Sequence, residues 1–295
     1  MSRVFDALLK SGDPLLKEED KAVPKAETPT LLRANDPIDE VESVVPKAVL
    51  TENANNGYKH IHAQLTDNSR LAYYLQPHGL VSEQLRFLRR SLHQDMPNGG
   101  VLIVSSPAAA DGKTLTAVNL AACLGDSGDT TLIADVDTRR PGLHSTIECE
   151  TTQHGIEEAF AENVQPHDVV QYIEELKLHA AFVSAVPTDP SKLISGAGVG
   201  KFLTWARENF RWTVLDTPPV VPVGDVSKLL PLVDAVLLVI RAHQTPRDLT
   251  KRAFELMGSH LYGVIMNETE SESTTRYSYF SRYYQGNGTN ARIAE

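Results

Sequence analysis

The amino-acid sequence predicts an α/β fold with a doubly wound, mostly parallel sheet that is covered by helices on both faces. Strand-like and helix-like segments alternate along the chain, which is typical of this fold class. The strand-like segments are short, uninterrupted apolar runs, as expected of strands that are buried on both faces. Hydrophobic residues make up 41% of the 295 residues and charged residues 22%, which is enough apolar material for a sizeable core.

The expected elements begin with a helix at 82–96, with Ser82 as its N-cap and leucines on one face. Strands are then expected at 101–106, 130–136, 180–186, 212–217, 234–242 and 261–267. Further helices are expected at 113–128, 156–163, 168–176, 199–210 and 245–258.

Composition divides the chain into three parts. Residues 1–74 are expected to be a largely disordered leader, because prolines and acids are frequent there and no apolar period is sustained. Val4, Phe5, Leu8 and Leu9 are the exception, and they indicate either a frayed helix or a short docking helix for a partner. Residues 75–267 are expected to form the folded domain, and 268–295 a mobile, tyrosine-rich tail.

Charge and composition exclude several classes of protein. The net charge is −10, from 28 Lys and Arg against 38 Asp and Glu, so no broad nucleic-acid-binding face is expected. The two cysteines are too few for a disulfide scaffold and are expected to be small buried residues. No apolar run reaches the roughly 18–20 residues that cross a bilayer. We therefore expect a cytoplasmic protein that contacts a membrane only through a partner.

A phosphate-binding loop is predicted where the strand at 101–106 runs through SSPAAADGKT into the next helix. Backbone N–H groups and the helix dipole favour an anion at such a helix start. Gly112 permits close approach, Lys113 can reach the β- and γ-phosphates, and the Thr114 hydroxyl can ligate Mg²⁺. Pro107 stands where the full pattern has a glycine, and alanines follow it. The context still favours nucleotide binding over an ordinary turn, and a P-loop NTPase-like fold.

Three aspartates follow predicted strands. Asp135 and Asp137 lie in LIADVDTRRP, and Asp216 ends the strand in WTVLDTPPV. In an open parallel sheet, ligands bind at the carboxyl edge of the strands. Carboxylates gathered there suit Mg²⁺, whereas a single strand-terminal Asp would indicate only a cap or a turn.

The order and spacing of these motifs resemble those of the bacterial protein-tyrosine kinases of capsule and exopolysaccharide export, over roughly residues 80–285. SSPAAADGKT resembles the family's Walker A motif, LIADVDTRRP its second acidic motif and VLDTPP its Walker B motif. A Glu-x-x-Arg-x-x-Arg pattern that packs protomers into a ring is matched by Glu83, Arg86 and Arg89. The terminal tyrosine cluster of the family is matched in RYSYFSRYY.

The resemblance implies an ATP- and Mg²⁺-dependent tyrosine autokinase. The implied catalytic residues are Lys113, Asp135, Asp137 and Asp216; the metal ligands Thr114, Asp135 and Asp216; and the nucleotide-binding residues Ala110, Asp111, Gly112, Lys113, Thr114, Leu115, Arg139 and Asn267. The implied phosphoacceptors are Tyr277, Tyr279, Tyr283 and Tyr284. The implied partners are a membrane-spanning polysaccharide copolymerase or chain-length adaptor, further copies of this chain in a ring, and a protein tyrosine phosphatase.

Some roles have two interpretations at this stage. A tyrosine hydroxyl needs a base when it attacks, and either Asp135 or Asp137 qualifies. Arg139 can contact phosphate or a neighbouring acid, and Asn267 can contact adenine or form a turn.

Two other functions compete with a kinase. One is an ATP-binding regulatory subunit of a polysaccharide assembly complex with weak or no kinase activity, which the alanine-rich loop favours. The other is a partition or cell-division ATPase, which the absence of a lysine at Ala108 disfavours.

Overall fold

The structure is a computed structural model, and it describes residues 57–66, 69–149 and 154–269. Within them the strands form one eight-stranded sheet in the order β1-β4-β5-β3-β6-β2-β7-β8. The strands are β1 (Lys59–Ile61), β2 (Gly100–Ser105), β3 (Thr131–Asp135), β4 (Val170–Ile173), β5 (Leu178–Ala181), β6 (Trp212–Asp216), β7 (Ala235–Arg241) and β8 (Leu261–Asn267). All neighbouring strands are parallel except β4 and β5.

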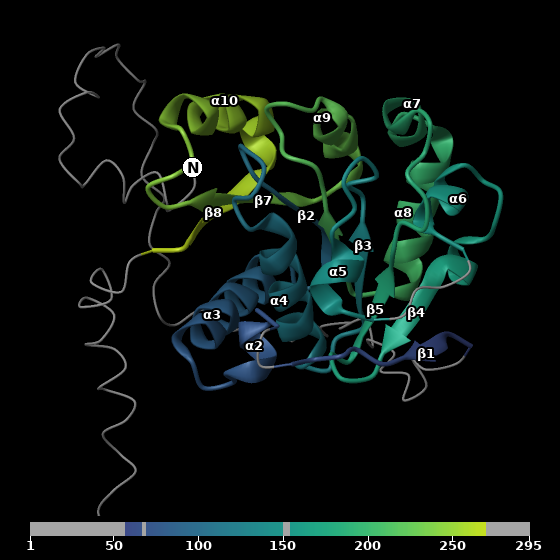
Figure 1. Cartoon of the computed structure of the whole chain (residues 1–295), viewed down its shortest axis with the longest axis horizontal. Helices are drawn as coiled ribbons and strands as arrows, with labels where there is room; N and C mark the ends of the chain where they lie inside the picture. Colours follow the sequence, from purple (N-terminus) through teal and green to yellow (C-terminus); the bar gives the residue numbers. More distant parts are fainter. Residues whose placement is uncertain (1–56, 67–68, 150–153, 270–295) are drawn as a thin grey trace, which may run out of the picture. The chain divides into compact units, whose positions relative to one another are not determined.

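Helices cover both faces of this sheet, as Figure 1 shows. They are α2 (Ala72–Leu75), α3 (Leu80–Asp95), α4 (Lys113–Gly125), α5 (Leu143–Ile147), α6 (Ile156–Phe160), α7 (Pro190–Ile194), α8 (Ala197–Asn209), α9 (Asp225–Leu229) and α10 (Arg247–Met257). Short 3₁₀ helices lie at Pro166–Val169, Leu230–Leu232 and Gly258–His260. The expected α/β fold is confirmed.

Side chains that alternate along the strands build two separate apolar cores. In β2, Leu102 and Val104 belong to the core beneath α3 and α4, whereas Val101 and Ile103 belong to the core beneath α6, α8 and α10. This alternation follows from the two-residue period of a strand. Because both faces are buried, the strands need apolar residues at every position, and this is why they are recognisable in the sequence as continuous runs.

The strand order brings three chain segments together at one edge. Strand β2 leads through α4 to β3, but β6 lies between β2 and β3 in the sheet. The carboxyl ends of β2, β3 and β6 are therefore neighbours, and α4 begins directly above them. Such a crevice is where open α/β sheets bind ligands.

The segment at 168–176 is not the helix that we expected. It forms a 3₁₀ turn and then β4, which pairs antiparallel with β5 through Val170–Ala181 and Ile173–Leu178. Its apolar residues fit a helical period, but Val, Tyr and Ile also favour strands. Pairing with a hydrogen-bonding partner strand decides the conformation here. The next strand, expected at 180–186, accordingly begins at Leu178 and ends at Ala181.

Ser82 does not cap the helix that contains it. The helix α3 begins at Leu80, with Gly79 as its N-cap, so Ser82 lies in the first turn. Its buried hydroxyl donates to the carbonyl of Gln76 at 2.7 Å. The hydroxyl thus ties α3 to the end of α2 instead of satisfying a free N–H group of its own helix.

Part of the segment that we expected to belong to the leader is included in the fold. Strand β1 pairs with β4, and α2 packs on α4. The helix expected around Val4 to Leu9 and the four tail tyrosines lie outside the described residues. Cys123 and Cys149 are free and buried, as expected. No helix among the described residues combines the length and the apolar character that crossing a membrane requires.

A close approach between α6 and α8 gives a test of the packing. A Cβ atom on Gly198 would lie 2.0 Å from the carbonyl oxygen of Phe160, whereas Gly200, in the same helix, has no neighbouring atom within 4 Å. We expect Gly198→Ala to lower the free energy of unfolding by about 1–3 kcal/mol. Gly200→Ala should leave it unchanged or raise it by about 0.5–1 kcal/mol. Urea denaturation of both variants measures this, and equal effects would contradict the described packing.

Candidate active site

The loop between β2 and α4 has the shape that a phosphate-binding loop requires. Helix α4 begins at Lys113, with Gly112 as its N-cap at φ +96°. A Cβ atom on Gly112 would lie 2.1 Å from the amide nitrogen of Asn267, so glycine is needed both for the backbone angle and for space. Ala110 also has a positive φ of 66°, which is a strained conformation for alanine.

Side chains from distant segments hold this alanine-rich loop in place. Asp111 is only 3% exposed, and its carboxylate accepts from the Ala108 N–H at 3.0 Å and from the Thr245 hydroxyl at 2.8 Å. The Asn267 amide donates to the Asp111 carbonyl at 3.0 Å. The carboxylate of Asp111 therefore braces the loop from inside, and β8 and the start of α10 fix it from outside.

The predicted aspartates and lysine meet at the carboxyl edge of the sheet. Asp135 and Asp216 are paired residues at the ends of β3 and β6. The Lys113 amine lies 3.1 Å from the carboxylate of Asp137 and 3.5 Å from that of Asp216. It also lies 3.3 Å from the Thr114 hydroxyl. The sequence prediction that these groups gather at one edge is therefore matched by their positions.

Backbone N–H groups orient the two acids of β3. Asp135 accepts from the N–H groups of Asp137, Gly142 and Leu143 at 3.0–3.1 Å. Asp137 accepts from the N–H of Arg140 at 3.1 Å. Strand β3 ends at Asp135, but the Val136 N–H still donates to the Asp216 carbonyl. This continued pairing keeps Asp135 and, just beyond the strand, Asp137 at the edge where Lys113 lies, and the carboxylate of Asp137 contacts the Lys113 amine.

Burial and mutual repulsion perturb the charges of this cluster. Burial, followed by the neighbouring Asp216, raises the pKa of Asp135 above its ordinary value. Burial likewise raises the pKa of Asp216, against the attraction of Lys113. Burial alone would lower the pKa of the Lys113 amine, but Asp216 and Asp137 outweigh it, so that pKa is raised. Three carboxylates thus face one amine, and the cluster carries excess negative charge.

The cluster fits a magnesium ion that is brought by a nucleotide. One carboxylate oxygen of Asp216 is buried and has no hydrogen-bond partner among the described residues, and the Thr114 side chain interacts with the same carboxylate group. Within residues 57–66, 69–149 and 154–269 no group of three or more His, Cys, Asp or Glu residues is arranged to hold a metal on its own. Mg²⁺ commonly takes one or two protein carboxylates and completes its shell with phosphates and water, so such a partial set suits it.

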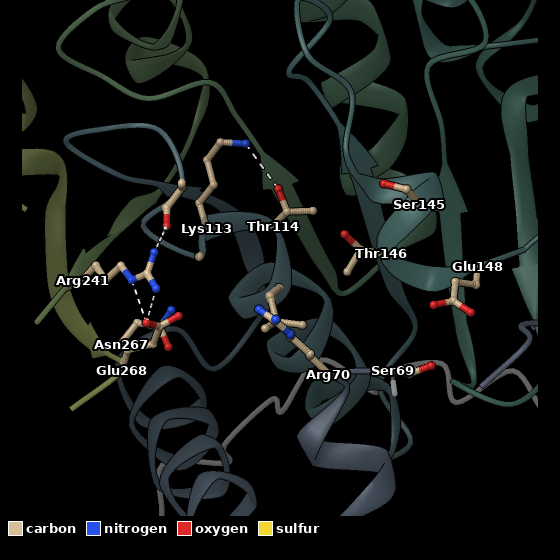
Figure 2. Close-up of a pocket in the computed structure, with 13 residues that line it drawn as sticks. Ser69, Arg70, Lys113, Thr114, Ser145, Thr146, Glu148, Arg241, Asn267 and Glu268 are labelled. Carbon is tan, nitrogen blue, oxygen red and sulfur yellow. Dashed lines mark hydrogen bonds and ion pairs between the residues drawn. The ribbon is translucent and has the colours of Figure 1, made fainter. Parts of the chain in front are cut away.

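A cavity of about 530 Å³ opens beside this cluster (Figure 2). Its lining contains the predicted residues Ala110, Gly112, Lys113, Thr114, Leu115 and Asn267. It also contains residues that the sequence did not single out: Ser69, Arg70, Ser145, Thr146, Glu148, Arg241 and Glu268. These lie in loops, in the short helix α5 or at the ends of strands, where no motif marks them. Only the fold brings them to the wall of the cavity.

Arg139 does not line this cavity. Its guanidinium donates to the carboxylate of Asp225 at 2.9 Å and to the Ser191 hydroxyl at 2.6 Å. Of the two interpretations, the structure therefore favours contact with a neighbouring acid. Arg139 links the segment after β3 to α7 and α9, whereas Asn267 does reach the loop.

The predicted oligomerisation residues make contacts within their own protomer. Arg86 forms an ion pair with Glu83, and its guanidinium lies 5.4 Å from the centre of the Tyr73 ring. Arg89 donates to the carbonyl of Cys123 at 2.8 Å. These contacts anchor α3 on α2 and α4.

Comparison with curated proteins identifies several tyrosine kinases as relatives. The chain is 28% identical to the tyrosine-protein kinase YwqD of Bacillus subtilis over 211 residues, which are 70% of the chain and 88% of that protein. It is 29% identical to the tyrosine-protein kinase etk of Escherichia coli over 202 residues, 67% of the chain but 28% of that protein. It is 26% identical to the tyrosine-protein kinase CpsD of Streptococcus agalactiae over 204 residues, 68% of the chain and 89% of that protein. No protein-family model matches the chain.

Solved structures give the same result. The chimerical protein CapA2B2 superposes with a TM-score of 0.64 at 25% identity, covering 70% of this chain and 92% of that one. The BceF tyrosine kinase domain gives a TM-score of 0.60 at 26% identity, covering 67% and 83%. The kinase domain of the Escherichia coli tyrosine kinase ETK shares the fold, with a TM-score of 0.64 at 23% identity and coverage of 76% and 84%. In sequence and in fold, the chain is thus similar to bacterial tyrosine kinases.

Proposed function

We propose that this chain is an ATP-dependent protein-tyrosine autokinase that regulates the length and export of capsular or exopolysaccharide chains. The observation that carries the proposal is the cluster of Lys113, Asp135, Asp137 and Asp216 beside a cavity lined by the phosphate-binding loop. The named relatives support the choice of tyrosine as acceptor. The tyrosines at 277, 279, 283 and 284 supply acceptors within the chain itself.

The chemistry follows from positioning and charge. In the reaction, the tyrosine oxygen attacks the γ-phosphorus, the bond to the β-phosphate oxygen breaks, and ADP leaves. Lys113 and the loop N–H groups hold the β- and γ-phosphate oxygens as negative charge moves toward the leaving group. Bound Mg²⁺, held by Thr114, Asp135 and Asp216, would neutralise phosphate charge. Asp135 or Asp137 accepts the phenolic proton.

The tail can meet the cavity of a neighbouring protomer. Tyr277 follows Asn267 by ten positions, a span of at most about 35 Å when extended. We propose that protomers assemble in a ring through α3, with Glu83, Arg86 and Arg89, and phosphorylate one another's tails. Each phosphate adds roughly −1.5 to −2 charges, so several of them on an acidic protein would loosen the ring.

The proposal includes partners outside the chain. A membrane-spanning polysaccharide copolymerase or chain-length adaptor would activate the kinase and hold it, from the cytoplasm, at the inner membrane. A protein tyrosine phosphatase would reset the tail. The kinases named among the relatives support this class of partner without identifying one.

One observation favours the competing regulatory-subunit function. Ala110 adopts a positive φ in a loop that has alanines where glycines are usual, and this strain weakens the case for tight nucleotide binding. Calorimetric titration with Mg-ATP distinguishes a binding site from an inactive one, and phosphotyrosine detection distinguishes a kinase from a binder.

Removal of the Lys113 amine should abolish autophosphorylation. We expect wild-type protein to acquire phosphotyrosine when it is incubated with Mg-ATP and an activating partner. The rate of this labelling should be at least about 100-fold lower in Lys113→Met. Lys201→Met is the matched control, because Lys201 pairs with Glu162 at the surface, outside the cavity lining. Absence of label on wild type would refute the kinase proposal, and label that survives Lys113→Met would refute the site.

Replacing the tail tyrosines should remove the phosphoacceptors without affecting nucleotide binding. A variant with Phe at positions 277, 279, 283 and 284 should lose most of the phosphotyrosine signal but bind Mg-ATP with unchanged affinity, because the proposal assigns nucleotide binding to the phosphate-binding loop and the charge cluster and only the acceptor role to these hydroxyls. Mass spectrometry of the wild-type tail should find phosphate on this cluster. Undiminished labelling of the variant would show that the acceptors lie elsewhere.

The repulsion between buried carboxylates predicts a pH effect on stability. Because the pKa values of Asp135 and Asp216 are raised in the folded state, these groups bind protons more tightly when folded, and their contribution to stability falls as pH rises toward neutrality. Asp216→Asn removes one of the repelling charges. Without nucleotide, the free energy of unfolding of the variant, relative to that of wild type, should increase by about 1–3 kcal/mol as the pH is raised from about 5 to about 8.

The same variant should lose the stabilisation that Mg-ATP gives to wild type, since it lacks a metal ligand. Thermal unfolding at both pH values, with and without Mg-ATP, measures both effects. A stability difference that does not change with pH would contradict the described charge cluster.

A further inference from the structure

A short turn before α2 contributes an arginine to the nucleotide cavity. Arg70 lines the cavity together with Gly112, Lys113 and Thr114, although more than forty positions separate it from them in the sequence. Figure 2 shows its side chain rising from the side of α2 toward the middle of the cavity, between Asn267 and Thr146. No motif of the phosphate-binding loop includes this residue.

The backbone of Arg70 is anchored on the helix that starts at the phosphate-binding loop. Asn119 of α4 is only 5% exposed, and its amide nitrogen lies 3.4 Å from the Arg70 carbonyl while its oxygen accepts from the Tyr73 N–H at 2.8 Å. Leu71, next along the chain, is fully buried. The turn is thus clamped on both sides of Arg70, and the guanidinium is delivered to the cavity from a fixed base.

Arg70 differs from the other two cations of the cavity lining. The Lys113 amine is paired with Asp137 and Asp216, and Arg241 donates to Glu268 at 2.7 Å. The Arg70 guanidinium is exposed and makes no ion pair or side-chain hydrogen bond with any described residue. An arginine held at a cavity wall without a partner has its donors available for a ligand, and its planar fork matches phosphate oxygens.

We propose that Arg70 binds the phosphate chain of the nucleotide, opposite Lys113 and the loop N–H groups. This inference rests on the nucleotide-binding part of the proposed function. It assigns the phosphates a second cation, from outside the phosphate-binding loop, which compensates for the alanines in that loop. It also connects the turn before α2 to occupancy of the site, because the guanidinium that this turn delivers would contact the bound phosphates.

The test compares Arg70→Gln and Arg70→Lys with wild-type full-length chain by calorimetric titration with Mg-ATP, Mg-ADP and inorganic tripolyphosphate. Arg70→Gln should weaken the binding of all three ligands by about tenfold or more, as expected for loss of a charged hydrogen bond. The affinity of Arg70→Lys should lie between those of wild type and Arg70→Gln, because a lysine keeps the charge but not the planar fork. Arg252→Gln is the matched control, because Arg252 pairs with Glu255 on the surface of α10.

Each outcome distinguishes the inference from the function on which it rests. If wild type does not bind Mg-ATP, both are overturned. If wild type binds and Arg70→Gln binds equally well, only the inference is overturned. If Arg70→Gln weakens the nucleotides but not tripolyphosphate, Arg70 contacts the base or ribose, and the phosphate assignment is wrong. Thermal unfolding without ligand should be the same for both Arg70 variants and wild type, since the exposed guanidinium has no partner within the described fold.

Discussion

The contact on which this site depends is the buried amine of Lys113 between the carboxylates of Asp137 and Asp216. One positive charge faces three buried acids, because Asp135 stands in register beside Asp216. The amine makes the burial of these acids possible but does not neutralise them. The remaining negative charge and the unpartnered oxygen of Asp216 favour a cation here, and the magnesium-bound nucleotide of the proposed function would supply it. The fold thus stores at one edge of the sheet an electrostatic imbalance that ligand binding relieves.

The phosphate-binding loop shows how a loop with few glycines can keep its shape. Its conformation is not left to local backbone freedom, because Asp111 ties Ala108 from within and Thr245 and Asn267 hold Asp111 from other segments. The strained backbone of Ala110 is kept in place by these surroundings. Tertiary hydrogen bonds therefore do here what glycine does elsewhere. They also make β8 and the start of α10 part of the structure of the loop.

Most of the sheet and the acidic edge could be predicted from the sequence because both follow from short-range rules. Buried parallel strands need continuous apolar runs, and strand-terminal acids share an edge whenever the strands are parallel. The conformation of 168–176 could not be predicted in this way. Its apolar spacing suits a helix as well as a strand, and pairing with β5 on one side and β1 on the other selects the strand. Ser82 similarly fits a cap by composition, yet Gln76 gives its hydroxyl a better partner.

Two arginines of the cavity that escaped prediction, Arg70 and Arg241, depend on contacts between segments that are distant in sequence. Arg70 is placed by Asn119 of α4, and Arg241 by Glu268 at the end of β8. A single sequence contains no local pattern for such pairs. For Arg139 the sequence left two contacts open, phosphate or a neighbouring acid, and the position of Asp225 favours the acid.

The end of β8 has a consequence for how acceptors reach the site. Because Asn267 touches the phosphate-binding loop, everything after it is tethered at the mouth of the cavity. In the proposed function, covalent attachment after Asn267 would give an acceptor group a local concentration of about millimolar, whatever the amount of protein in the cell. Selection between a protomer's own tyrosines and those of its neighbour would then depend on the direction of approach to the γ-phosphate, since abundance would favour neither.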